Sequence, residues 1–318
     1  MAVINTNVPT APRYQPELID PAYDDPDAVR RVVEQAGPYP NLAGAAGYAG
    51  FQLPTMAWWR STLGPAARES LPGSSAVLDN PHFIEAARRV FESEVVRPTS
   101  VTINLNGPMP IGAAHLDTPS FRGSTPMSPW LLSIMGSSGL FERWAVRVPA
   151  ALTWFYPGEG AGYEYWPDGP GGPSKVVAGP FGNVALVGDN DYMFHRVGAI
   201  GDPQRYDAVK NYGSQSLASF ENERWIVRDG DEPREEYARD EMRISLLWRS
   251  IAFESKVDER RYDEHLDDLD AETLVDVFVG DLRDRGVRCA RPMNYLTDPE
   301  WVEMLNATYG FAGIDAGA

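Results

Sequence analysis

The stretch GYEYWPDGPGGPSKVVAGPFGNVALVGDNDYMFHRVG, residues 162–198, decides the fold class. Short runs rich in valine and aromatic residues alternate in it with clusters of glycine, proline, asparagine and aspartate. That alternation is typical of short β-strands joined by turns. It predicts strands at residues 163–166, 175–178, 183–187 and 192–197. This region therefore belongs to an all-β sandwich or barrel.

The same pattern continues on both sides of this stretch. It predicts further strands at residues 100–105, 112–116, 146–156, 224–227 and 242–253. Nine strands of this length fit one jelly roll or barrel better than two independent domains. The fold expected from the strand pattern is mainly β, with helices at its flanks.

Helical patterns precede and follow the predicted strands, at residues 25–35, 80–94, 257–284 and 298–309. The first two begin with a capping side chain followed by proline, which is favoured in the first turn of a helix. Residues 1–20 are expected to form an extended arm. We therefore predict a single domain over residues 1–318, with a partly helical segment (1–95), a β core (96–253) and a C-terminal helical segment (254–318).

Composition excludes several classes of partner. Of the 318 residues, 43% are hydrophobic, and 45 Asp and Glu against 28 Lys and Arg give a net charge of -17. A surface this acidic repels phosphate backbones and anionic lipids, which argues against nucleic-acid and membrane partners.

The single cysteine, Cys289, excludes an intramolecular disulfide and a cysteine-based zinc site, and we interpret it as a buried bystander. No secretory signal or membrane span is indicated, so a cytoplasmic protein is expected.

Histidine is scarce, which makes each one informative. His115 and Asp117 lie two apart on a predicted strand, so their side chains project from the same face. His195 lies on another predicted strand. Two imidazoles and one carboxylate are the ligands of the facial triad that holds non-haem Fe(II) and leaves coordination positions open. The sequence predicts a metal site at these three residues; the alternative is two structural histidines near an unrelated aspartate.

A second His-x-Asp, from His265 to Asp267, shows that the motif alone is weak. It falls in the predicted helix 257–284, where residues two apart point about 200° away from each other. We interpret it as part of a solvated, charged helix face.

The segment RISLLWR, residues 243–249, places Arg243 and Ser245 on one face of a predicted strand. A guanidinium fork beside a hydroxyl suits a carboxylate held bidentately in a partly dry pocket, whereas the alternative for Arg243 is a surface ion pair. With His-x-Asp, a distal histidine and a following Arg-x-Ser, the sequence resembles the Fe(II)/2-oxoglutarate-dependent oxygenases.

The resemblance covers about residues 101–253 and implies a double-stranded β-helix (jelly-roll, cupin-like) core. It implies that His115, Asp117 and His195 bind Fe(II), that Arg243 and Ser245 bind 2-oxoglutarate, and that O2 is the oxidant. The family places the arginine closer to the distal histidine than the 48 positions found here, so an insertion is expected at about 198–241. Arg249, on the same face of the strand, is the competing candidate for 2-oxoglutarate.

The activity implied is oxidation, by default hydroxylation, of a small organic molecule, as in a biosynthetic pathway, with release of succinate and CO2. Asp117 argues against the halogenating branch of the family, whereas desaturation, cyclisation and epimerisation stay open. Two alternatives remain: a non-haem iron oxygenase that does not use 2-oxoglutarate, and a non-catalytic cupin-like ligand-binding protein. The sequence indicates neither the substrate nor the oligomeric state.

Position along the chain suggests four further pocket residues: Asn104, Arg122, Tyr156 and Trp248. Each of the four can equally well be explained as a turn residue or a packing residue.

Overall fold

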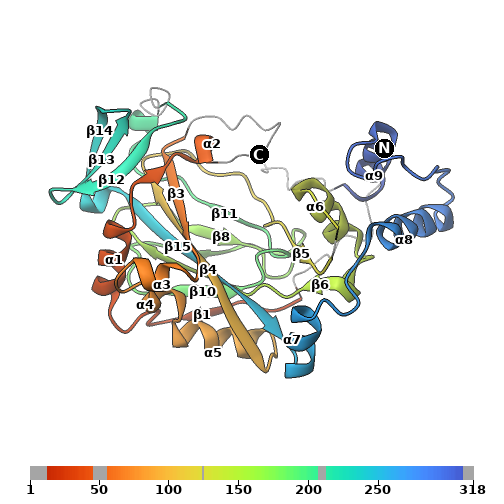
Figure 1. Cartoon of the computed structure of the whole chain (residues 1–318). Coiled ribbons are helices and arrows are strands. Elements are labelled where there is room, and N and C mark those ends of the chain that lie inside the picture. The colour runs from red at the N-terminus through yellow and green to blue at the C-terminus, as the bar shows by residue number, and fades with distance from the viewer. Residues whose placement is uncertain (1–12, 46–55, 124, 207–212, 311–318) are drawn as a thin grey trace.

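The computed structural model describes residues 13–45, 56–123, 125–206 and 213–310. Its centre is a six-stranded antiparallel sheet, the main sheet, in the order β1-β10-β7-β15-β4-β3 (Figure 1). The strands are β1 (Glu17–Ile19), β3 (Trp58–Leu63), β4 (Val95–Asn106), β7 (Ala150–Phe155), β10 (Ala185–Gly188) and β15 (Arg243–Phe253). The strands β4 and β15 are the longest of the main sheet and pair with each other along their whole length.

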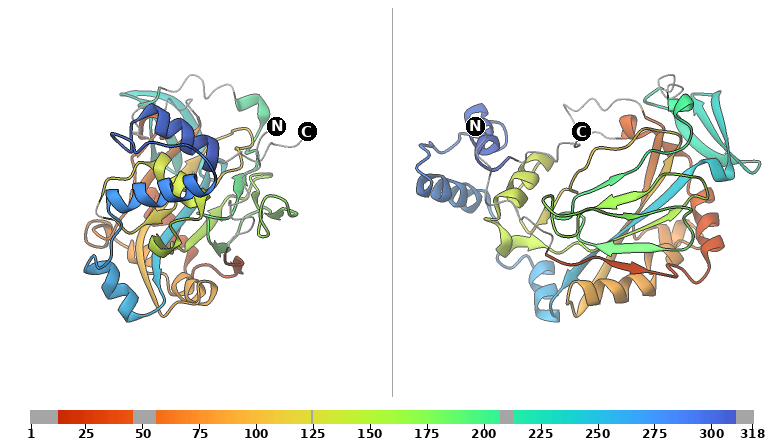
Figure 2. Two further views of the ribbon diagram at one scale, coloured as in Figure 1. Left: turned by 90° about the vertical axis from the view of Figure 1, so that its right-hand side faces the viewer. Right: turned by 180° about the vertical axis from the view of Figure 1, so that it is seen from behind.

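A smaller antiparallel sheet, the second sheet, lies against one face of the main sheet and is nearest the viewer on the right of Figure 2. Its order is β11 (His195–Val197), β8 (Tyr163–Tyr165) and β9 (Lys175–Val177). Buried side chains from both sheets, among them Trp154, Tyr163 and Met193, form one hydrophobic cluster between them. Two facing antiparallel sheets with helices at the flanks confirm the predicted fold class.

Helices cover the opposite face of the main sheet (Figure 1). The predicted helices 25–35 and 80–94 are observed as α1 (Pro26–Gln35) and α5 (Pro81–Val90), capped by the side chains of Asp25 and Asn80. Three short helices accompany them: α2 (Leu42–Ala45), α3 (Ala67–Ser70) and α4 (Ser75–Leu78). Apolar residues of α1, α4 and α5 pack with the main sheet into the largest hydrophobic cluster.

A separate four-stranded sheet lies within and beside the expected insertion. It consists of β14 (Glu232–Ala238), β13 (Arg224–Asp229), β12 (Leu217–Glu221) and β2 (Tyr39–Pro40). The predicted strand 224–227 is part of β13. Because these strands pair with one another and with β2, they extend the fold at its edge without interrupting the main sheet.

A second helical group combines α6 (Pro129–Ser138), from the middle of the chain, with the C-terminal helices α8 (Ala271–Asp284) and α9 (Pro299–Tyr309), and the three share a hydrophobic cluster of their own. The two-stranded ribbon of β5 (Ser120–Phe121) and β6 (Ala145–Val146) and the helix α7 (Lys256–Asp263) lie between this group and the main sheet (Figure 1). Cys289 is half-buried against the same cluster, not fully buried as expected.

Three sequence-based elements are wrong. The predicted strand 146–156 is divided into β6 and β7 around Val148 and Pro149, since proline has no N–H to donate to a neighbouring strand. The predicted helix 257–284 is broken into α7 and α8, because His265 and Asp267 adopt positive φ angles of 54° and 66° and Asp270 caps a new helix. The predicted strand 112–116 is only a single bridge at His115, since Pro110, which precedes it, has no N–H to donate to a neighbouring strand. Of the predicted arm, residues 1–12 lie outside the described residues. In the described part of the chain, no helix combines the length and apolar character needed to cross a membrane.

Candidate metal centre

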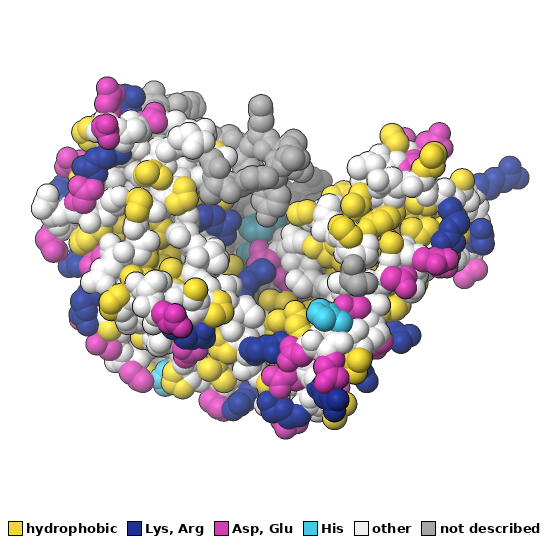
Figure 3. Space-filling view, viewed as in Figure 1, with side chains coloured by type: hydrophobic (Ala, Val, Ile, Leu, Met, Phe, Trp, Pro, Cys, Tyr) yellow, Lys and Arg dark blue, Asp and Glu magenta, His cyan; other side chains and the backbone are white. Residues whose placement is uncertain are grey.

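The alternation of side chains along β15 decides which residues reach the space between the two sheets. Arg243, Ser245 and Leu247 face the second sheet and line a cavity of ≈ 160 Å³, the central cavity. Trp248 projects from the other face, where its Nε1 donates to the carbonyl oxygen of Leu78. Figure 3 shows histidine, acidic and basic side chains at the bottom of a hollow between the β core and the C-terminal helices.

His115, Asp117 and His195 come together at this cavity, as predicted from the sequence. One ligand atom from each lies within 4.8 Å of the other two, and within the described residues this is the one group of its kind. The two histidines are also paired through their backbones, since each N–H donates to the carbonyl oxygen of the other at 3.0 Å. The N–H of Asp117 donates to the carbonyl oxygen of Asn190 at 3.0 Å, which fixes the third ligand next to this pair.

Backbone carbonyl groups set the direction of both imidazoles. Nδ1 of His115 lies 3.0 Å from the carbonyl oxygen of Ala113, and Nδ1 of His195 lies 2.9 Å from that of Met193. Because a carbonyl only accepts, each Nδ1 carries the proton and each Nε2 is left with its lone pair for a metal. Burial lowers the pKa of His195 to about 4, so its imidazole is neutral at physiological pH. Both rings therefore have the form that binds a metal.

Arg249 fixes the carboxylate of Asp117. One of its Nη atoms lies 2.5 Å from Oδ2 of Asp117, while Oδ1 lies 3.8 Å from Nε2 of His195. Burial by itself would raise the pKa of Asp117, but the charge of Arg249 and its hydrogen bond to the carboxylate, with the nearby imidazoles, outweigh burial and lower that pKa. The carboxylate is ionised, with one oxygen occupied by Arg249 and the other directed toward His195.

Arg249 also contacts Asp191 at 3.5 Å, and burial raises the pKa of this carboxyl well above its usual value. Its guanidinium is thus engaged by two acidic side chains. Arg249 is also not among the residues that line the central cavity.

Arg243, in contrast to Arg249, contacts no acidic side chain among the described residues. It is 1% exposed, and its Nη1 donates to Oδ1 of Asn106 at 3.2 Å. Its Nε and Nη2 are buried and donate to no atom, and no described carboxylate lies within ion-pairing distance. Burial lowers the pKa of Arg243 to about 10, so the side chain still carries its charge at pH 7. The result is a cationic donor fork in the central cavity without a counter-charge.

The other predicted pocket residues are placed differently. Asn104 lines the central cavity and accepts a hydrogen bond of 2.9 Å from Nε1 of Trp58. Tyr156 lies in the hydrophobic cluster between the sheets and is not among the residues that line the cavity. The pocket role of Trp248 is wrong, because it stands an odd number of positions from Arg243 on the strand and so faces the helices.

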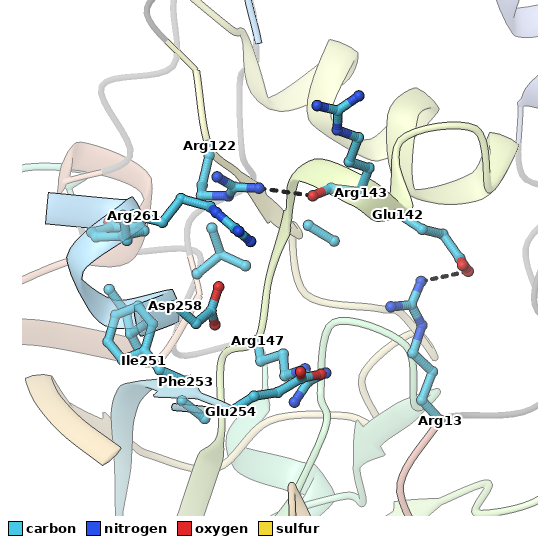
Figure 4. A pocket seen from close by; sticks show the side chains of 14 residues that line it. Arg13, Arg122, Glu142, Arg143, Arg147, Ile251, Phe253, Glu254, Asp258 and Arg261 are labelled. Carbon is cyan, nitrogen blue, oxygen red and sulfur yellow. Dashed lines mark hydrogen bonds and ion pairs between the residues drawn. The ribbon is translucent and has the colours of Figure 1, made fainter. Parts of the chain in front are cut away.

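The pocket role of Arg122 is also wrong. Arg122 lines a different cavity of ≈ 240 Å³, the arginine cavity, shown in Figure 4. It forms an ion pair with Asp267 and donates to the carbonyl oxygen of Arg143 at 2.9 Å. Its neighbours are paired as well: Arg13 with Glu142 at 2.8 Å and Arg147 with Glu254. The arginine cavity is thus held together by ion pairs between segments that are distant in the sequence.

Several lining residues of the central cavity have no counterpart among the sequence-based candidates, among them Trp58, Arg60, Tyr163 and Asn190. Trp58 and Arg60 lie on β3, a strand that the pattern did not predict. The alternation of Thr, Arg and Trp in WWRSTL is the signal that could have found it.

No protein-family model matches the chain, and no curated protein matches its sequence. Solved structures show distant similarity to the chain. A prolyl hydroxylase from Trichoplax adhaerens in complex with a hypoxia inducible factor peptide is 12% identical, with a TM-score of 0.43 over 79% of this chain and 87% of that one. An oxidoreductase of the 2OG-Fe(II) oxygenase family from Burkholderia pseudomallei is 12% identical, with a TM-score of 0.41 over 76% and 87%.

HygX from Streptomyces hygroscopicus, solved with nickel and 2-oxoglutarate bound, is 9% identical, with a TM-score of 0.39 over 76% of this chain and 86% of that one. One of these three structures is named as a member of the family that the motifs resemble. Similarities of this size transfer neither a substrate nor a reaction to this chain.

Proposed function

We propose that the chain is an oxygenase that uses Fe(II), 2-oxoglutarate and O2 to oxidise a small organic molecule, with hydroxylation as the outcome. The observation that carries the proposal is Arg243, a buried guanidinium without a counter-charge, in the same cavity as a His-Asp-His group. A molecule with two carboxylates can engage a metal ion with one end and this donor fork with the other.

The residues present fit an Fe(II) ion. Two neutral imidazoles and one carboxylate, with no thiolate, are the ligand set of non-haem Fe(II) sites that keep open positions. Each Nδ1 is engaged by a backbone carbonyl group, which leaves Nε2 as the ligand atom, and Asp117 has one oxygen that Arg249 does not occupy. A single ion between the three side chains would neutralise the carboxylate and satisfy both lone pairs.

The residues present also fit 2-oxoglutarate. Arg243 offers two buried N–H groups without acceptors, and Ser245 lies two residues along the same strand face. A planar guanidinium matches a carboxylate with two parallel hydrogen bonds, which are strongest where water is excluded. Since Arg249 is engaged by Asp117 and Asp191, we assign the far carboxylate of 2-oxoglutarate to Arg243.

When bound, Fe(II) supplies the redox chemistry by which O2 and 2-oxoglutarate give succinate, CO2 and an oxidised substrate, with one oxygen atom in each organic product. The chain's residues prepare that step. Carbonyl groups hold the imidazoles in one tautomer, and Arg249 restricts Asp117 to one oxygen as ligand. Arg243 orients the cosubstrate, and the apolar side chains of Leu152, Val197 and Leu247 exclude water from the cavity wall.

A small molecule suits this cavity better than a nucleic acid. The cavity is ≈ 160 Å³, and the net charge of the chain is -17. That charge repels a phosphate backbone at long range.

Anaerobic titration of the metal-free protein with Fe(II) and then 2-oxoglutarate tests the proposal through the visible charge-transfer band of the ternary complex. We expect a band that requires both additions, is lost in His195→Ala, and needs more 2-oxoglutarate in Arg243→Gln. In air, the wild type should form succinate from 2-oxoglutarate.

Two other results would overturn the proposal in different ways. Iron binding without a band would favour an iron oxygenase in which Arg243 binds the substrate's own carboxylate. Absence of iron binding would favour a non-catalytic, cupin-like ligand-binding protein.

A further inference from the structure

The turn between β10 and β11 holds two of the three candidate metal ligands by its backbone. The carbonyl oxygen of Asn190 accepts a hydrogen bond from the N–H of Asp117 at 3.0 Å, and that of Met193 lies 2.9 Å from Nδ1 of His195. Between these two carbonyl groups the turn carries Asp191, an acidic residue that is only 3% exposed. The backbone contacts of the turn do not explain why a carboxyl group is buried here.

Asp191 does not belong to the metal site itself. It is absent from the group formed by His115, Asp117 and His195, and it is not among the residues that line the central cavity. Within the described residues its carboxyl group has one ion-pair partner, Nη2 of Arg249, at 3.5 Å. An effect of Asp191 on a bound ion therefore passes through Arg249.

Arg249 holds Asp117 by a single hydrogen bond. Arginine and carboxylate groups frequently pair through two parallel N–H···O bonds, which cover both oxygens. Here Nη2 alone donates to Asp117, at 2.5 Å to Oδ2, and the same nitrogen contacts Asp191. Oδ1 of Asp117 is left open and lies 3.8 Å from Nε2 of His195.

The position of Asp191 accounts for this single bond. Because Nη2 is shared between two carboxyl groups, the guanidinium is directed at the gap between them and not at both oxygens of Asp117. Without Asp191, Asp117 would be the one acidic partner of Arg249 in the described part of the chain. The guanidinium could then take the bidentate arrangement, cover Oδ1 and compete with the ion for it.

We propose that Asp191 is a positioning residue of the metal centre, which keeps Arg249 on Oδ2 of Asp117 and so leaves Oδ1 available to Fe(II). The inference rests on the proposed function for the identity of the ion. It adds to that function a residue that contacts neither the ion nor the cosubstrate.

The test is an anaerobic calorimetric titration of the metal-free, full-length chain with Fe(II), in the absence of 2-oxoglutarate. Asp191→Ala should weaken Fe(II) binding about tenfold or more, as is typical when the groups that orient metal ligands are removed. Asp191→Asn keeps an oxygen acceptor in the same place and should stay within about threefold of the wild type.

Asp281→Ala is the matched control. It removes the aspartate of another arginine pair, Asp281 with Arg285 at 2.5 Å, which lies on α8 in the second helical group. This variant should bind Fe(II) as the wild type does.

A change at Arg249 separates positioning from a general loss of structure. Lysine carries a compact charge and cannot cover two carboxylate oxygens with a planar fork. In the Arg249→Lys background, Asp191→Ala should therefore weaken Fe(II) binding less than about threefold. A loss caused by misfolding would instead persist in this background and would lower the midpoint of thermal unfolding of the metal-free protein.

Three outcomes would overturn the inference: Asp191→Ala binds Fe(II) as tightly as the wild type, Asp191→Asn is as weak as Asp191→Ala, or the loss is the same in the Arg249→Lys background. Failure of the proposed function has a different signature. A wild type that binds Fe(II) but forms no charge-transfer band with 2-oxoglutarate contradicts the cosubstrate, while the Fe(II) titrations still decide the role of Asp191. A wild type that binds no Fe(II) contradicts both.

Discussion

Arg243 and Arg122 are both nearly buried, yet their surroundings are opposite. Arg122 has a side chain 9% exposed and bonds to the carboxylate of Asp267 and to two backbone carbonyls. Arg243 is 1% exposed, and within the described part of the chain its one hydrogen-bond partner is the carboxamide of Asn106. The same side chain is fully paired in the arginine cavity and largely unpaired in the central cavity.

The difference separates a structural arginine from one that awaits a ligand. Burying a guanidinium costs several kcal/mol unless a counter-charge and acceptors compensate for it. At Arg122 the protein supplies a counter-charge and acceptors, so the ion pairs of the arginine cavity join the C-terminal segment to the β core. At Arg243 the described residues supply one acceptor and no counter-charge. This is the expected arrangement where a bound anion completes the site.

The largest effect should come from Arg243→Gln. We expect the affinity for 2-oxoglutarate to fall about 100-fold, because two charge-assisted hydrogen bonds are lost. Affinity for Fe(II) should stay within about threefold of the wild type, since no metal ligand is touched. Titration of the charge-transfer band measures both. If Arg122→Gln weakened 2-oxoglutarate equally, the contrast between the two arginines would be disproved.

Arg122→Gln should instead act on folding. We expect the free energy of unfolding to fall by about 2 kcal/mol, because Asp267 loses its nearest cation and two carbonyls lose a charged donor. Urea unfolding measures this, and the Arg122→Gln/Asp267→Asn double variant should lose less than the sum of the single losses. Additive losses would mean that the pair is not coupled.

Without 2-oxoglutarate, Arg243→Gln should not destabilise the protein and should add about 1 kcal/mol to its stability. Burial lowers the pKa of Arg243 to about 10, so the unfolded chain binds this proton more tightly than the native state. The cost of the charge is therefore present at pH 7 and relieved only above about pH 10. Thermal unfolding of the metal-free protein checks the sign. A loss of stability similar to that of Arg122→Gln would reveal a compensating partner for Arg243.

The smallest effect is expected for Arg143→Gln. Arg143 is 69% exposed and lies 3.9 Å from Asp267, which already pairs with Arg122. Exposed pairs of this kind contribute less than about 0.5 kcal/mol. A larger loss in urea unfolding would show that the arginine cavity acts as one cooperative network.

Much of the β core is readable from the sequence because its strands alternate with turn residues. The strands near residues 163–197 and 242–253 follow from that local pattern alone. β3 was missed although Gly64 and Pro65 mark its end, because it stands apart from the continuous strand pattern that begins at residue 100. The break between α7 and α8 was missed because the apolar spacing continues across it. The pairing of β12, β13 and β14 with β2 is long-range, and no local pattern specifies it.

The candidate metal ligands were predictable because rare residues at strand spacing limit the choices. The roles of Arg243 and Arg249 were not separable in the sequence, since both lie on one strand face. Only the tertiary contacts of Arg249 with Asp117 and Asp191 distinguish them. Arg122 was wrongly assigned to the central cavity because it lies only five residues from Asp117 in the sequence. The direction in which the chain turns between the two residues cannot be predicted from that spacing.

The backbone pair between His115 and His195 closes a loop of 80 positions through main-chain hydrogen bonds. Closing a flexible loop of that length costs about 4 kcal/mol of chain entropy. In small zinc domains metal binding meets that cost, so they unfold when the metal is removed. Here main-chain hydrogen bonds between the two histidine residues contribute to meeting it. We therefore expect the protein to stay folded when the metal is removed.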